Sequence, residues 1–74
     1  RQAREKAILD RLVAGDRTIP EMVATIYADV DRSLHGAAAL SVLAQVEWLI
    51  ERGLVGLAAG ESPTPTLASR LELA

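Results

Sequence analysis

Hydrophobic residues recur at helical spacing in three segments of the chain, and the first segment covers about residues 3–14. Gly15 follows it, at the position where a glycine commonly ends a helix. The apolar residues that we expect to face the core are Ile8, Leu9, Leu12 and Val13. The pattern predicts an amphipathic first helix.

The second segment begins with the signature of a helix start. In the stretch TIPE, Thr18 is placed to cap a helix, and Glu21 is placed to reach back to it as the second half of a capping box. Pro20 falls in the first turn, where its missing N–H removes no helical hydrogen bond. The polar stretch ADVDRS ends the helix, because short polar side chains compete for backbone hydrogen bonds. The apolar side predicted for this helix comprises Met22, Val23, Ile26 and Tyr27.

The third segment, about residues 36–52, is the longest, and Gly53 follows it as the expected stop. At about 100° per residue, a set of its apolar positions falls within about 120° of one another. These positions are Ala39, Val42, Leu43, Val46, Leu49 and Ile50. The arc predicts a helix that buries one face in the core.

Two short strands are predicted after the third helix, at about residues 53–57 and 66–74, joined by a loop rich in turn-forming residues. On the second strand Leu71 and Leu73 should share one side. Three helices followed by a hairpin form a winged helix-turn-helix, a mostly α (small α+β) fold with a two-stranded β-wing. We expect residues 1–74 to form a single domain of this kind.

Composition and charge narrow the function classes. The formal net charge is −2, whereas a domain that holds nucleic acid usually has a basic excess. The chain has no cysteine, which excludes disulfides and thiolate metal sites and fits a cytoplasmic location. No uninterrupted apolar run approaches the roughly 20 residues that span a bilayer, so no membrane contact is expected. The start at Arg1, without a methionine, predicts a piece of a larger protein; the resemblance described next implies that this piece is its C-terminal fragment.

The stretch TIPEMVATIYADVDRSLHGAAALSVLAQVEWLIERGLV resembles the β-lactamase-associated winged-helix domain. Its most specific features are TI-E-V, IY-DVD, LH and the alanine-rich opening of the third helix, although relatives often have proline where this chain has Gly36. That domain follows the catalytic domain of metallo-β-lactamase-fold hydrolases, including the mitochondrial β-lactamase-like endoribonuclease group. The resemblance implies a parent enzyme that binds one or two zinc ions through an HxHxDH motif, which this sequence lacks.

The resemblance therefore implies a non-catalytic accessory domain that packs in cis on a metallo-β-lactamase-fold domain and shapes substrate access. The parent's substrate stays open between RNA, a thioester and another ester. Two alternatives remain: a fragment of a DNA-binding winged-helix transcriptional regulator, and a dimerisation module.

His35 is the natural candidate for a metal or catalytic site, since it is the chain's single histidine. A zinc site needs three or four ligands, and only Asp29, Asp31 and distant glutamates accompany His35. We favour a structural role for His35 at the helix entry, with Asp31 and Ser33 as capping residues. The serines lack a second histidine or a lysine dyad that could activate them. We therefore expect no catalytic residue, no metal and no cofactor in this segment.

The side of the third helix opposite the core is the candidate interaction surface. Leu40, Ala44 and Trp48 lie on it, and tryptophan among small residues is typical of interface anchors. We expect these residues to meet the catalytic domain or a second subunit of a homo-oligomer. A DNA-reading helix would present several polar or basic side chains, and only Gln45 and Arg52 qualify, so sequence-specific DNA binding is not expected.

Basic residues gather on the first helix. They are Arg1, Arg4, Lys6 and Arg11. If the parent cuts RNA, they could line a path for its substrate, because single-stranded binding uses positive grooves. Glu5 and Asp10 lie among them, which favours an ordinary solvated surface.

Overall fold

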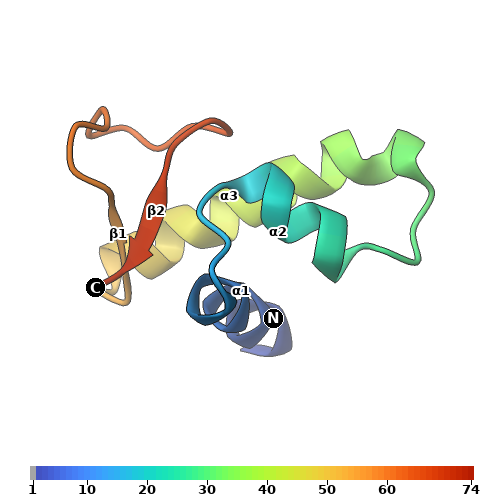
Figure 1. The fold of residues 1–74 in the computed structure, drawn as a ribbon, viewed down its shortest axis with the longest axis horizontal. Helices are drawn as coiled ribbons and strands as arrows, with labels where there is room; N and C mark the ends of the chain where they lie inside the picture. The colour runs from blue at the N-terminus through green and yellow to red at the C-terminus, as the bar shows by residue number, and fades with distance from the viewer. Residues whose placement is uncertain (1) are drawn as a thin grey trace.

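The computed structural model describes residues 2–74 and shows helices on one side of a short hairpin (Figure 1). The elements are α1 (Gln2–Ala14), α2 (Ile19–Ile26), the 3₁₀ turn η1 (Arg32–Leu34), α3 (His35–Glu51), β1 (Val55–Leu57) and β2 (Leu71–Leu73). This order confirms the predicted winged helix-turn-helix. The longest helix, α3, packs against α2, passes behind it in this view, and carries the wing at its C-terminal end (Figure 1).

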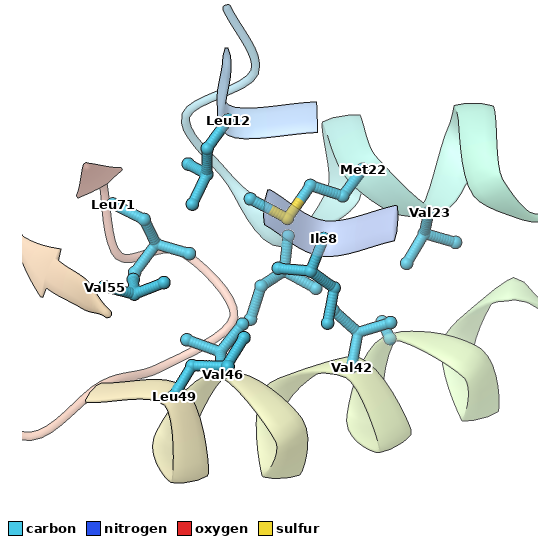
Figure 2. Close-up of a cluster of buried hydrophobic side chains, with 11 residues drawn as sticks. Ile8, Leu12, Met22, Val23, Val42, Val46, Leu49, Val55 and Leu71 are labelled. Atoms are coloured by element: carbon cyan, nitrogen blue, oxygen red, sulfur yellow. The ribbon is translucent and has the colours of Figure 1, made fainter. Parts of the chain in front are cut away.

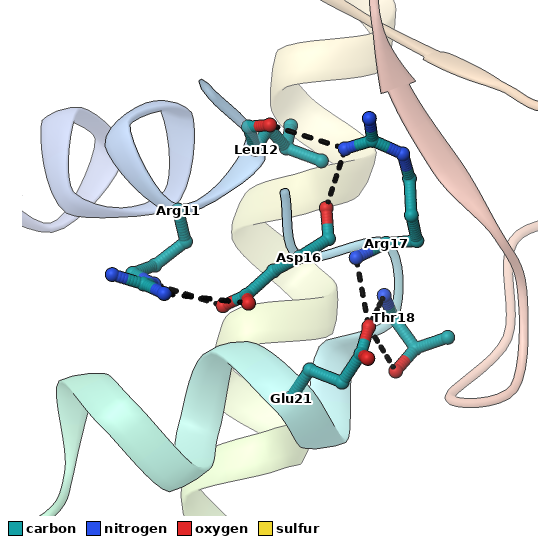
Figure 3. A network of polar contacts seen from close by, with 6 residues as sticks. All are labelled: Arg11, Leu12, Asp16, Arg17, Thr18 and Glu21. Atoms are coloured by element: carbon teal, nitrogen blue, oxygen red, sulfur yellow. Dashed lines mark hydrogen bonds and ion pairs between the residues drawn. The ribbon is translucent and has the colours of Figure 1, made fainter. Parts of the chain in front are cut away.

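Local hydrogen bonds of Arg17 and Glu21 hold the turn between α1 and α2 (Figure 3). Gly15 adopts a φ of 117°, a left-handed conformation that favours glycine at a helix end. The guanidinium of Arg17 donates to the backbone carbonyls of Leu12 and Asp16, at 3.1 and 2.9 Å. The Glu21 carboxylate accepts from the backbone N–H of Thr18 at 2.9 Å, which confirms the predicted capping box.

The wing is an antiparallel pair of short strands that is tied back to the helices. Val55 pairs with Leu73, and Leu57 pairs with Leu71. The backbone N–H of Leu71 also donates to the carbonyl of Arg17 at 2.7 Å, which joins β2 to the α1–α2 turn. Both strands are shorter than predicted. The hydroxyl of Ser69 accepts from the backbone N–H of Thr66 at 2.8 Å, and such local bonds hold this segment as a turn instead of a strand.

The core lies between the three helices and the wing (Figure 2). It consists of Ile8, Leu12, Ile19, Met22, Val23, Ala39, Val42, Val46, Leu49, Val55 and Leu71. Leu9, Ile26, Tyr27, Leu43 and Ile50 pack against it while partly exposed. One expected core position is wrong, because Val13 is 73% exposed. On β2, Leu71 is buried, whereas Leu73 is 42% exposed.

The segment Arg32–Glu51 is long and apolar enough to cross a membrane by length and composition alone, with a mean hydropathy of 1.2. This does not contradict the expectation based on uninterrupted apolar runs, because a helix that packs in the core of a domain meets the same criterion of length and composition. The inner face of α3, formed by Ala39, Val42, Val46 and Leu49, is buried in the core. The remaining apolar side chains of the segment are partly or fully exposed.

Candidate docking surface

The outward side of α3 is a continuous apolar surface that the domain's own core does not use. It consists of Ala37, Leu40, Ser41, Ala44 and Trp48, which we call the outer face; all five are exposed. Leu40 is 60% exposed and Trp48 is 41% exposed. Helices on the surface of a domain usually present charged and polar residues on this side. The three residues expected to form an interaction surface, Leu40, Ala44 and Trp48, therefore lie together on one exposed side of the helix.

The N-terminal end of α3 is held by a compact turn built around His35. Its Nε2 atom lies 3.0 Å from the carbonyl oxygen of Tyr27 and 3.1 Å from that of Val30. Carbonyl oxygens only accept, so Nε2 carries the proton and donates to both. The Asp31 carboxylate accepts from the backbone N–H of Ser33 at 2.9 Å, and this hydrogen bond lowers the pKa of Asp31. His35 and Asp31 thus position the start of the helix.

The C-terminal end of α3 is fixed to α1. Gly53 follows the helix with a φ of 79°, as the sequence predicts for its stop. The Arg52 guanidinium contacts the buried Glu5 carboxylate at 3.4 Å. Glu47 and Glu51 are both exposed, and no salt bridge within residues 2–74 includes either of them.

Neither residue that the sequence offered for reading DNA bases is available on the outer face. Arg52 is directed to Glu5 on α1. Gln45 is partly buried, and its side-chain oxygen is enclosed without a hydrogen-bond partner among the described residues. A recognition helix needs donors and acceptors that project into the major groove. The outer face of α3 offers a single polar side chain, the hydroxyl of Ser41.

Each described basic side chain of α1 has a partner inside the domain. Arg4 donates to the hydroxyl of Tyr27, and its guanidinium lies 4.9 Å from the centre of the Tyr27 ring. Lys6 pairs with Asp10 at 3.0 Å. Arg11 pairs with Asp16 at 2.8 Å (Figure 3). Arg1, the fourth residue of the predicted basic cluster, lies outside the described residues.

Residues 2–74 contain no group of three or more His, Asp or Glu side chains that could hold a metal ion. They also enclose no pocket. The Nε2 atom of His35, one of the two nitrogens that could ligate a metal, already donates to two carbonyls.

The family model of the β-lactamase-associated winged-helix domain matches residues 18–60, which is more than half of the chain. The chain belongs to the β-lactamase-associated winged-helix family. The matched segment runs from the capping box of α2 through α3 and β1 and includes the whole outer face. Searches of curated proteins and of solved structures find no match.

Membership confirms the resemblance that the sequence indicates. A β-lactamase-associated winged-helix domain is an accessory domain of β-lactamase-fold proteins. Sequence reasoning identified His35 only as a helix-entry residue. Its contacts with the carbonyls of Tyr27 and Val30 could not be foreseen, because nothing in the sequence fixes how the intervening turn folds back.

Proposed function

We propose that this chain is a non-catalytic accessory domain of a metallo-β-lactamase-like zinc-dependent hydrolase, and that it packs in cis on the catalytic domain through the outer face of α3. The observation that carries this proposal is the exposed apolar surface around Trp48 in place of a polar recognition helix. Tryptophan is enriched at the energetic centres of protein interfaces. Membership in a family associated with β-lactamase-fold proteins supplies the partner.

Packing on the catalytic domain would place the winged helix beside that domain's substrate and restrict access to it. The substrate of the hydrolase is then RNA or an ester, including a thioester. The described basic side chains of α1 already have internal partners. We therefore assign any RNA contact to the hydrolase's catalytic domain, where the zinc ions are also expected.

A single introduced thiol tests the docking, because the chain has no cysteine of its own. Ser41→Cys places the thiol on the outer face, and Val13→Cys places one on the exposed side of α1 as a matched control. The alkylation rate of each thiol is measured by peptide mass spectrometry in the isolated chain and in the full-length protein. We expect at least about tenfold slower alkylation of the Ser41→Cys thiol in the full-length protein, with no change at Val13→Cys. Equal rates for Ser41→Cys in both proteins would contradict the proposal.

A further inference from the structure

The outer face of α3 continues into two acidic residues. Glu47 and Glu51 follow Leu40 and Ala44 at the spacing i, i+4, i+7 and i+11, so all four lie within about 60° on one strip of the helix. Trp48 directly follows Glu47 in the sequence and lies about 60° from Glu51 around the helix. A molecule that covers Leu40, Ala44 and Trp48 therefore comes within reach of both carboxylates.

This acidic pair conflicts with the local electrostatics of the helix. Glu47 and Glu51 are four residues apart, where like charges repel each other. They also lie at the C-terminal end of α3, where the helix dipole favours cations. The nearest cation along the helix, Arg52, is turned to Glu5 on α1.

Other charged groups of the domain show the opposite arrangement. Lys6 is paired with Asp10 on α1, and Arg11 is paired with Asp16. The Glu21 carboxylate accepts from the backbone N–H groups of Arg17 and Thr18 at the start of α2. Charges that oppose the local electrostatics of a helix, with no compensating contact inside the domain, commonly mark a functional surface.

We infer that the surface that docks on the outer face of α3 is apolar opposite Leu40 and Trp48 and carries lysine or arginine side chains opposite Glu47 and Glu51. This inference rests on the proposed function, and its occupant is the metallo-β-lactamase-fold domain of the same protein. Covering two carboxylates without counter-charges would be unfavourable, because a desolvated charge needs a partner. Lysine or arginine side chains on the partner, which we call the basic rim, would pair with both carboxylates. They would also fix the position of the metallo-β-lactamase-fold domain along α3.

Charge reversal tests this inference in the full-length protein that carries Ser41→Cys. The readout is the ratio of the alkylation rate in the isolated chain to that in the full-length protein, which cancels any direct effect of charge on the thiol. We expect Glu47→Lys with Glu51→Lys to lower this ratio about tenfold or more. Glu72→Lys, the same charge change at an exposed position on β2, should leave the ratio unchanged. The neutral pair Glu47→Gln with Glu51→Gln should lower it less, and should remove its dependence on salt.

The outcomes separate this inference from the proposed function. If the ratio is high in the wild-type background and stays high after charge reversal, the domain docks but the basic rim is wrong. If the ratio is near one already in the wild-type background, the proposed function fails and the inference fails with it. A ratio that rises with protein concentration would identify a second copy as the occupant and overturn both. Lysine near a helix C-terminus does not oppose the dipole, so the reversed chain should fold, and its melting curve checks this.

Discussion

The two faces of α3 are both apolar, but only one of them is buried in the core of the domain. On the inner face, Val42, Val46 and Leu49 are fully buried against α1, α2 and the wing (Figure 2). On the outer face, Leu40 is 60% exposed and Trp48 is 41% exposed. Burial of the inner face contributes to the core of the domain, whereas the exposed residues of the outer face do not. This difference is the basis of the proposal that the outer face docks on a partner.

Replacing one leucine on each face of α3 by alanine should give the largest difference in the free energy of unfolding. Leu49→Ala should lower the free energy of unfolding of the isolated chain by about 2–5 kcal/mol, because it removes a fully buried side chain and leaves a cavity. Leu40→Ala should change it by less than about 0.5 kcal/mol, because Leu40 is exposed. Urea denaturation of both variants measures the difference. Similar losses for the two leucines would mean that the outer face is part of the fold.

Loss of the His35 contacts at the start of α3 should lower the free energy of unfolding by less than Leu49→Ala does. His35→Ala removes the donor to the carbonyls of Tyr27 and Val30 and should cost about 1 kcal/mol of unfolding free energy. His35→Gln restores a side-chain donor and should recover part of the loss. The same denaturation experiment measures both variants. A His35→Ala variant as stable as wild type would show that the outer face is oriented without this contact.

The Glu21 carboxylate at the start of α2 should make the stability of the domain depend on pH. Hydrogen bonds from the backbone of Arg17 and Thr18 lower the pKa of Glu21 from its ordinary value of 4.5. The folded state therefore binds this proton less readily than the unfolded chain. The stabilisation is present above pH 4.5 and is lost as the pH falls through the lower, folded-state pKa. Glu21→Gln should lose less stability than wild type between about pH 6 and about pH 3; parallel curves would contradict this account.

Binding of duplex DNA to the isolated chain should be the smallest effect of all. The outer face has no basic side chain, and the nearby charges are those of Glu47 and Glu51, which repel phosphates. Titration of the isolated chain with unrelated duplexes at physiological salt should show weak binding without sequence preference. Sub-micromolar binding to one sequence would favour a DNA-binding regulator and reverse the interpretation of the outer face.

Local signals in the sequence predict much of the fold. Glycines 15 and 53 and the capping box at Thr18 depend only on neighbouring residues, and all three are present. The periodicity of α3 also separates its inner and outer faces correctly. Val13 was misplaced because it lies about 100° from the centre of the buried arc of α1. Only the packed partners of a helix determine how wide its buried arc is.

Contacts between distant segments account for what the sequence could not predict. The ion pair of Lys6 with Asp10 follows from their i, i+4 spacing. In contrast, Arg4 meets the Tyr27 hydroxyl across 23 residues of chain, and Glu5 meets Arg52 across 47. The residues of the outer face were predicted because exposure on a helix follows from its periodicity. The proposed partner of these residues is another domain, so its surface cannot be derived from this sequence or this fold.

Trp48→Ala tests the central claim most directly, through the free energy of opening of α3 obtained from hydrogen exchange over residues 37–51. In the isolated chain the substitution should change this free energy by only a few tenths of a kcal/mol, as for Val13→Ala on α1. In the full-length protein Trp48→Ala should lower it by about 2 kcal/mol, because an interfacial anchor is lost, while Val13→Ala should not. A large loss already in the isolated chain would place Trp48 in the core. No difference between the two proteins would contradict docking through the outer face.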